Sequence, residues 1–230
     1  MQSIPHCCAL CHAVCVEGLC PDCKNRYFAA ALPRCRQCAH TLPESGESLI
    51  CGSCLKQPPA FDQTIAVTDY TPPVDQLVLA FKFGGALALA PLFARMLQAA
   101  MQRHPADFTR PDVLVPVPLA PGRLASRGFN QAHEIARPLS RQLGIALMPR
   151  LIKRIRETVP QTEIALRARR SNIRGAFAIS EGGLPAVKGR HIALVDDVLT
   201  SGETVGELAR MLKAAGAASV SCLIVARTPL

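Results

Sequence analysis

Aromatic residues are scarce in this chain of 230 residues, which has no tryptophan, two tyrosines and eight phenylalanines. Proteins that bind single-stranded nucleic acid without sequence preference stack its bases on aromatic side chains. With so few aromatics, the sequence offers little support for a stacking platform. Any nucleic-acid binding is then expected to be mainly electrostatic and to weaken steeply as the salt concentration rises.

The chain also lacks a long uninterrupted apolar run. Its most apolar later stretch, residues 85–101, contains Pro91 and Arg95 and is too short to cross a bilayer. The first residues show neither the basic segment nor the apolar core of an export signal. We therefore expect no membrane insertion and a cytoplasmic protein, whose 11 cysteines stay reduced.

Charge is unevenly spread along the sequence, although the whole chain has a formal net charge of +9. Residues 110–190 contain 15 Lys and Arg against 5 Asp and Glu, a local charge of +10, so the remaining residues come close to neutrality. This basic segment indicates an anionic partner, and a phosphorylated metabolite or a nucleic acid would satisfy it. A solvated, arginine-rich surface is the alternative interpretation.

Ten of the eleven cysteines precede residue 55, and eight of them form four Cys-x-x-Cys pairs. The pairs are Cys8/Cys11, Cys20/Cys23, Cys35/Cys38 and Cys51/Cys54. Two such pairs complete a closed, tetrahedral four-thiolate zinc site, so the eight ligands predict two structural zinc ions. Redox motifs and plainly buried cysteines are the alternatives, but the segment has few large apolar residues to form a core without metal.

The order in which the pairs share the ions is open. Gaps of 8, 11 and 12 residues favour a sequential arrangement, with the first two pairs on one ion and the last two on the other, over an interleaved one. We prefer Cys8 as the first ligand because it keeps the two-residue spacing. Cys7 and Cys15 are then spare, and His12 and His40 are candidate substitute ligands.

After the cysteines, the stretch 56–60 with its paired prolines predicts a linker and a domain boundary near residue 58. We expect a zinc-ribbon domain at 1–57 and a second domain at 58–230, in which apolar strands and amphipathic helices alternate. The predicted strands are Thr64–Tyr70, Asp112–Pro118, Arg190–Val195 and Ser219–Ala226, and the predicted helices are 74–81, Gln131–Leu143 and Glu203–Ala215. Such alternation predicts an α/β fold, a parallel sheet flanked by helices.

Two adjacent carboxylates, Asp196 and Asp197, follow the apolar run 191–195. Ligands of parallel α/β sheets bind at the carboxyl ends of the strands, so this position suits a site. Carboxylates accept hydrogen bonds from a vicinal diol such as ribose, and they hold Mg²⁺ directly or through its water molecules. The pair therefore predicts a sugar-like ligand with a magnesium ion.

The residues after this pair lead into a predicted helix. Free N–H groups at a helix start form an anion site, and Gly202 would let the backbone approach a phosphate closely. The residues predicted to hold this side of the ligand are Val198, Leu199, Thr200, Ser201, Gly202, Glu203 and Thr204. An ordinary strand-turn-helix with acidic residues near the helix start is the alternative. The complete segment 195–204 resembles the phosphoribosyl-pyrophosphate signature of phosphoribosyltransferases.

With both motifs present, the whole chain resembles the ComF family of bacterial competence-related proteins, which joins a double zinc ribbon to a type I phosphoribosyltransferase domain. The supporting segments are Tyr70–Phe83 with its Phe81-Lys82-Phe83, Val115–Leu119 followed by Arg127–Gln131, and Gln161 with Arg167, Arg170 and Asn172. The resemblance implies the type I phosphoribosyltransferase fold.

The same resemblance implies that the loop after the 112–118 strand faces pyrophosphate. Arg127 is then the leading charge partner, acting as a catalytic residue with Asp196 and Asp197, and Arg123 is a weaker candidate. Asn130 and Gln131 are equally suited to fixing the loop. Residues 154–174, which contain six Arg and two Glu, lie where such folds carry a mobile hood that neutralises a leaving group.

Two hypotheses follow. In the first, the protein binds phosphoribosyl pyrophosphate with Mg²⁺, and as an enzyme it would displace pyrophosphate from ribose C1 toward an acceptor that the sequence does not identify. In the second, it is a non-catalytic zinc-ribbon protein that binds single-stranded DNA. The family's association with DNA uptake and natural competence implies DNA-uptake proteins as further partners, and a nucleotide-like ligand could gate such a role.

Overall fold

A computed structural model describes residues 6–28, 33–43, 48–103, 108–156 and 173–229. Of the predicted hood at 154–174, only the two ends belong to these ranges. Gln161, Arg167, Arg170 and Asn172 lie outside the described residues.

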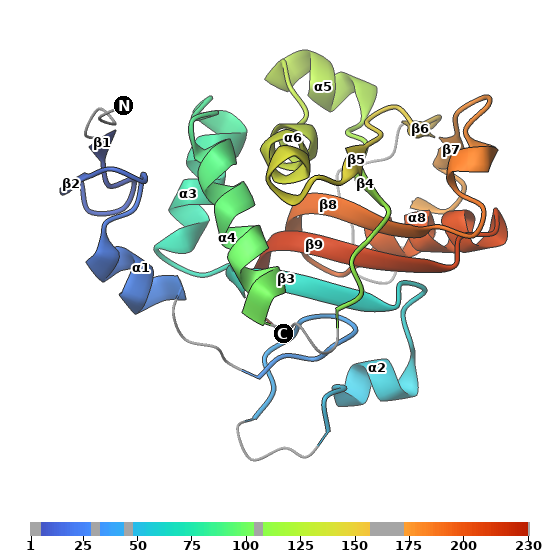
Figure 1. The fold of residues 1–230 in the computed structure, drawn as a ribbon, viewed down its shortest axis with the longest axis horizontal. Helices are drawn as coiled ribbons and strands as arrows, with labels where there is room; N and C mark the ends of the chain where they lie inside the picture. The colour runs from blue at the N-terminus through green and yellow to red at the C-terminus, as the bar shows by residue number, and fades with distance from the viewer. Residues whose placement is uncertain (1–5, 29–32, 44–47, 104–107, 157–172, 230) are drawn as a thin grey trace.

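A five-stranded parallel sheet forms the centre of the molecule, in the order β3-β9-β8-β4-β5 (Figure 1). The strands are β3 (Gln63–Asp69), β4 (Val113–Pro116), β5 (Ala146–Leu147), β8 (His191–Leu199) and β9 (Ser219–Arg227). The central strands are short apolar runs buried on both faces, as parallel strands covered by helices usually are. The predicted parallel sheet flanked by helices, in the type I phosphoribosyltransferase fold, is confirmed.

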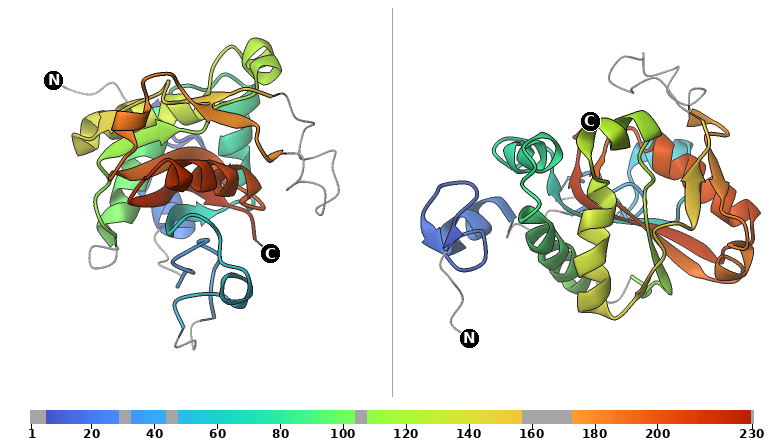
Figure 2. Two further views of the ribbon diagram at one scale, coloured as in Figure 1. Left: turned by 90° about the vertical axis from the view of Figure 1, so that its right-hand side faces the viewer. Right: turned by 90° about the horizontal axis from the view of Figure 1, so that it is seen from above.

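Successive residues of the central strand β8 point to opposite faces of the sheet. Ala193 and Val195 join the apolar core beneath helices α4 (Leu89–Arg103) and α6 (Gln131–Leu143). Ile192 and Leu194 join a second core beneath α8 (Glu203–Ala214). The view from above shows α4 and α6 on one side of the sheet and α8 on the other (Figure 2). The sheet is therefore the middle of three layers.

Smaller elements surround the carboxyl ends of the strands. They are α3 (Val74–Phe83), α5 (Pro121–Arg127) and the antiparallel pair β6 (Ile152–Arg154) and β7 (Phe177–Ile179), whereas the 3-10 turn η2 (Leu184–Ala186) leads into the start of β8. The β6–β7 pair brackets the predicted hood, and α5 follows β4, where the pyrophosphate loop is expected.

Two features differ from the sequence-based expectations. Strand β8 continues to Leu199, so Asp196 and Asp197 lie inside it, because Asp196, Val198 and Leu199 still pair along β9. Helix α4 was not predicted at all. Pro91 fits its first turn, where the missing N–H has no partner to lose, and Arg95 faces outward. Among the described helices, none is long and apolar enough to cross a membrane.

The cysteine-rich segment occupies two places on the molecule. The hairpin of β1 (His6–Cys7) and β2 (Val14–Cys15), with α1 (Pro21–Phe28), lies beside α4. Residues 33–43 and 48–56, the latter ending in α2 (Gly52–Lys56), lie next to β3 instead (Figures 1 and 2). The two parts of the segment are therefore attached to different faces of the sheet domain.

Candidate functional site

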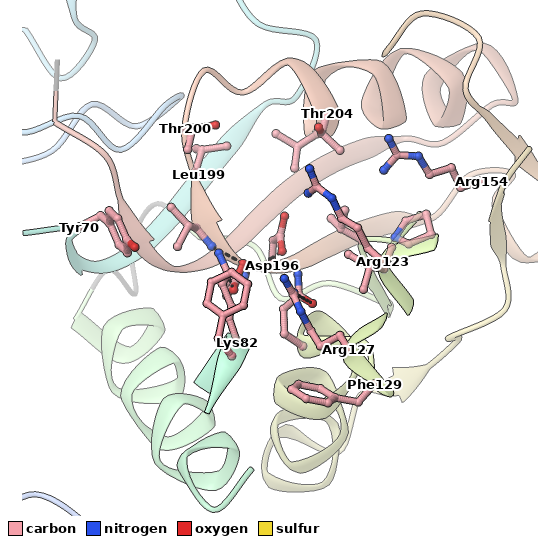
Figure 3. Close-up of a pocket in the computed structure, with 18 of the residues that line it drawn as sticks. Tyr70, Lys82, Arg123, Arg127, Phe129, Arg154, Asp196, Leu199, Thr200 and Thr204 are labelled. Atoms are coloured by element: carbon pink, nitrogen blue, oxygen red, sulfur yellow. Dashed lines mark hydrogen bonds and ion pairs between the residues drawn. The ribbon is translucent and has the colours of Figure 1, made fainter. Parts of the chain in front are cut away.

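A cavity of about 800 Å³ opens at the carboxyl ends of the parallel strands. Its floor is the end of β8, and its walls come from α3, from the loop leading to α5, and from the start of α8 (Figure 3). The labelled side chains that line it are Tyr70, Lys82, Arg123, Arg127, Phe129, Arg154, Asp196, Leu199, Thr200 and Thr204. The cavity lies where open α/β sheets bind their ligands.

The acidic pair forms the floor of this cavity. The backbone N–H of Asp197 donates to Oδ1 of Asp196 at 2.9 Å, and the N–H of Val198 donates to Oδ1 of Asp197 at 2.8 Å. Burial and the adjacent charge of Asp197 raise the pKa of Asp196 well above its ordinary value, and the charge of Lys82 opposes this only in part. The pair is therefore held close together at an electrostatic cost.

A cation already neutralises part of this cost. The Nζ atom of Lys82 lies 2.9 Å from Oδ2 of buried Asp197, yet that oxygen accepts no hydrogen bond from the described residues. The attraction is thus one of charge rather than of aligned hydrogen bonding. An under-coordinated buried carboxylate oxygen, next to a second carboxylate, is a ligand set that fits Mg²⁺.

The loop between β8 and α8 forms the second part of the site. Gly202 is the N-terminal cap of α8, and its φ of 80° places it in the left-handed region that favours glycine. Val198, Leu199, Thr200, Glu203 and Thr204 line the cavity with it, whereas exposed Ser201 does not. Of the predicted phosphate-holding residues, the structure thus brings all but Ser201 to the cavity.

Two arginines form the opposite wall. Arg123 and Arg127, both on α5, line the cavity across from the acidic pair. The Nη1 group of Arg127 donates to Oε1 of Gln131 at 2.6 Å, and its guanidinium lies 5.1 Å from the ring centre of Phe83. These two contacts hold the guanidinium toward the acidic pair, where Figure 3 shows it.

The loop before α6 is held as well. Asn130 donates from Nδ2 to the carbonyl of Val117 at 3.1 Å, and its Oδ1 accepts from the N–H of Ala132 as the cap of α6. Asn130 and Gln131, which sequence could not distinguish, therefore each fix a different part of this wall.

Sequence reasoning missed one wall of the cavity. This wall is lined by Tyr70, Leu79, Lys82 and Phe83, and no pattern in the sequence indicates a role for any of them. The apolar period of α3 predicts its buried stripe and nothing about what its last turn faces. No local pattern marks Lys82 as a partner of Asp197, because 115 positions separate them and only the packing of α3 brings them together.

The eight predicted metal ligands gather in two groups. The first is Cys8, Cys11, Cys20 and Cys23, and the second is Cys35, Cys38, Cys51 and Cys54, with the ligand atoms of each group within 4.8 Å of one another. We call them the first and the second cluster. Their order is sequential rather than interleaved. Cys7, Cys15, His12 and His40 belong to neither group.

The chemistry of both clusters fits zinc. The N–H of Cys23 donates to Sγ of Cys20 at 3.4 Å, and the N–H of Cys51 donates to Sγ of Cys35 at 3.3 Å. Burial raises the pKa of Cys8, but neighbouring N–H groups outweigh it and lower that pKa to about 6. Backbone N–H groups outweigh burial in the same way at Cys35, whose pKa falls to about 7. Four cysteine thiols around one point, one of which favours the thiolate in each cluster, could hold a structural zinc ion.

Comparison with known proteins agrees with this architecture. The family model described as phosphoribosyl transferase domain matches residues 92–229. The DNA utilization protein YhgH of Salmonella typhimurium is 38% identical, over 99% of this chain and 100% of its own length. Competence protein F of Haemophilus influenzae is 32% identical, over 92% of this chain and 91% of its own. The chain therefore belongs to the ComF family of proteins with a phosphoribosyl transferase domain.

Proposed function

We propose that the cavity binds phosphoribosyl pyrophosphate, or a related ribose phosphate, together with Mg²⁺. The observation that carries this proposal is the arrangement of three kinds of group around one cavity: an acidic pair, a helix N-terminus with a glycine cap, and a wall of arginines. Each matches one part of the ligand. No single part is specific, but the three in this order match a ribose that carries phosphates at both ends.

The roles follow from the chemistry of each group. Asp196 and Asp197 accept hydrogen bonds from the ribose hydroxyls and hold Mg²⁺. The N–H groups at the start of α8 and the hydroxyls of Thr200 and Thr204 hold the 5-phosphate. Arg127, with Arg123 as a weaker contributor, faces the pyrophosphate.

Transfer chemistry would use the same arrangement. Displacement of pyrophosphate at ribose C1 builds negative charge on the leaving oxygen, and Arg127 stands beside that position in this proposal. Magnesium, when bound, neutralises the pyrophosphate oxygens. Lys82 lies close enough to Asp197 to share its charge, and it would be available to contact the ligand's phosphates if the metal supplied positive charge at that carboxylate.

Calorimetry with phosphoribosyl pyrophosphate and Mg²⁺ tests the proposal. Wild-type protein should bind, and Asp197→Asn should weaken binding by about 100-fold, because charged contacts to both metal and sugar are lost. Asp22→Asn is the matched control, since Asp22 is exposed on α1 and away from the cavity, and it should bind as wild type does. Absence of binding to wild type, or equal binding by Asp197→Asn, would overturn the proposal.

A role in DNA utilization or uptake is the second part of our proposal. It rests on the names of the relatives and on the basic segment 110–190. If the chain binds single-stranded DNA directly, three phosphate contacts would lower the affinity by about tenfold or more between 50 and 200 mM salt. An affinity that does not change with salt would contradict electrostatic binding.

A further inference from the structure

Arg227 is a buried cation at the carboxyl end of β9, between two parts of the molecule that are distant in sequence. Its side chain is almost fully enclosed, with the residue 5% exposed. In the sheet it stands opposite Leu199 of β8 on one side and Asp69 of β3 on the other. It therefore lies directly beside the point where the loop between β8 and α8 leaves the sheet. We call this loop, residues 200–202, the phosphate loop, after its role in the proposed function.

On one side, the guanidinium holds the start of this loop. Its Nη1 group donates to the carbonyl of Leu199 at 2.7 Å and also to the carbonyl of Thr200. The same group donates to the carbonyl of Thr228 at 3.0 Å, and the N–H of Thr228 donates to Leu199 at 3.0 Å. Three carbonyls converge on one rigid fork, so the loop is fixed in direction where it begins.

On the other side, the guanidinium holds the second cysteine cluster. Its Nε–H donates to the carbonyl of Cys38 at 2.9 Å, and Nη2 contacts Nε2 of His40. Arginine can only donate, so the neutral imidazole accepts at Nε2. Cys38 and His40 belong to the turn at residues 35–40, which carries the first two ligands of the second cluster and which we call the knuckle.

The second cluster is held rigidly against the sheet by further contacts. The N–H of Thr64 donates to the carbonyl of Arg36 at 2.9 Å, and Oγ1 of Thr64 donates to the carbonyl of Gln37. Arg34 forms an ion pair with Asp69 at 2.7 Å. The first cluster is placed differently, since α4 stands between it and the sheet (Figure 1). Only the second cluster shares a side chain with the phosphate loop among the contacts described above.

We propose that Arg227 is a positioning residue that ties the phosphate loop to the second cluster, so that ribose-phosphate binding depends on metal in the second cluster and not on metal in the first. This inference rests on the proposed function of the cavity. With the knuckle closed by its ion, the carbonyl of Cys38 and the ring of His40 keep the guanidinium under the loop. With the ion lost, the knuckle opens and the guanidinium loses two of its five partners.

The test compares variants of the full chain that differ in one cluster. Cys54→Ser and Cys23→Ser each remove one buried ligand, and each should lower the zinc content from about two ions per chain to about one. Calorimetry with ribose 5-phosphate should show about tenfold weaker binding for Cys54→Ser, the size of an ordinary coupling between sites. Cys23→Ser should stay within about twofold of wild type.

Arg227→Lys covers the case in which Cys54→Ser does not fold. It keeps the charge and loses the fork, so ribose 5-phosphate should bind about tenfold more weakly while both zinc ions are retained. Arg95→Lys is its control, because Arg95 donates to a carbonyl beside the first cluster, that of Glu17, at 2.7 Å. A purely structural role would make the affinity follow the stability measured by urea unfolding in all four variants.

Failure of the proposed function and failure of this inference alone would give different results. If wild-type protein binds neither ribose 5-phosphate nor phosphoribosyl pyrophosphate, the proposed function and this inference both fail. If wild type binds and the two cysteine variants weaken the affinity equally, or Arg227→Lys leaves it unchanged, the inference alone is overturned.

Discussion

Each of the two cysteine clusters has four cysteine ligands, in two pairs with the same spacing, yet the two clusters are joined to the sheet by different kinds of contact. The first is built into the apolar core around α4, with Leu19 and Phe28. The second has a small core of its own and is attached mainly by hydrogen bonds to β3 and Arg227. Apolar burial is non-directional, whereas hydrogen bonds set geometry. The same motif can therefore stabilise a helix in one place and orient a loop in another.

The largest effect on stability is expected at the contact between α4 and the first cluster. Leu92 is buried on α4 and packs in the same apolar core as Leu19, which lies beside the first cluster. Leu92→Ala should lower the free energy of unfolding by about 2–5 kcal/mol through lost burial and a cavity. Urea unfolding measures this, and exposed Leu184→Ala should change little. The Leu92→Ala variant should keep its affinity for ribose 5-phosphate. A loss of affinity would show that the first cluster also influences the cavity.

A smaller effect is expected where the second cluster meets β3. The Nη1 group of Arg34 donates to the carbonyl of Ala39 at 2.9 Å and to Oδ1 of Asp69 at 2.7 Å. Arg34→Ala should cost about 1–3 kcal/mol of unfolding free energy, because the partly buried carboxylate of Asp69 loses its cation and keeps only the hydroxyl of Thr41 as a donor. It should also weaken ribose 5-phosphate binding several-fold. Arg95→Ala, at the exposed contact of the first cluster, should change stability by under about 0.5 kcal/mol and binding not at all.

Lowering the pH should affect ligand binding at the acidic pair, Asp196 and Asp197, differently from zinc binding at the two clusters. The raised pKa of Asp196 means that it keeps a proton at pH values where an ordinary aspartate is ionised. Binding of Mg²⁺ and ribose phosphate must expel that proton, so the affinity should fall by up to about tenfold per pH unit below this pKa. The unliganded protein instead gains stability from this group as the pH falls through the same window.

Calorimetry in two buffers with different ionisation enthalpies would measure the proton release. Lys82, Asp197 and Arg127 face Asp196 and shape its titration, so Lys82→Met should raise the pKa further and move the loss of affinity to higher pH. Zinc content, assayed at each pH, shows whether the clusters stay loaded. Affinity that is flat with pH, or that falls only as zinc is released, would contradict this account.

The smallest effect is expected at the spare cysteine of the first cluster. Cys7 is exposed and outside the group of four ligands. Cys7→Ser should leave about two zinc ions per chain and change stability by under about 0.5 kcal/mol. Cys8→Ser is the matched variant and should lose one ion. A loss of zinc on Cys7→Ser would show that the first cluster uses the other register.

Much of the fold could be predicted because its elements carry local signals. Helix α6 was predicted with its observed ends, since Asn130 caps its start and Gly144 its end. Strand β8 was predicted to end four residues too early, because acidic side chains look like a strand end although the backbone continues to pair with β9. Helix α4 was missed because Pro91 looks like an interruption and is in fact part of the first turn.

Part of the candidate site could be found in the same way. Asp196, Asp197 and the residues up to Thr204 are consecutive, so their chemistry is legible as a motif. The predicted domain boundary near residue 58, which divides the chain into 1–57 and 58–230, stays a prediction. Apolar contacts and hydrogen bonds join both clusters to the sheet domain, so the two parts are not separated by a gap in the packing.

By itself, the sequence determined the ligand types, the spacing of the cysteine pairs, the alternation of strands and helices, and the consecutive loop at 195–204. All of these are properties of neighbours along the chain. Only the tertiary structure decided that Lys82 meets Asp197 and that Arg227 joins the second cluster to the phosphate loop. Such pairs are set by which parallel strands become neighbours in the sheet and by how helix α3 packs at their carboxyl ends, and no local period of 2 or 3.6 residues records either of these.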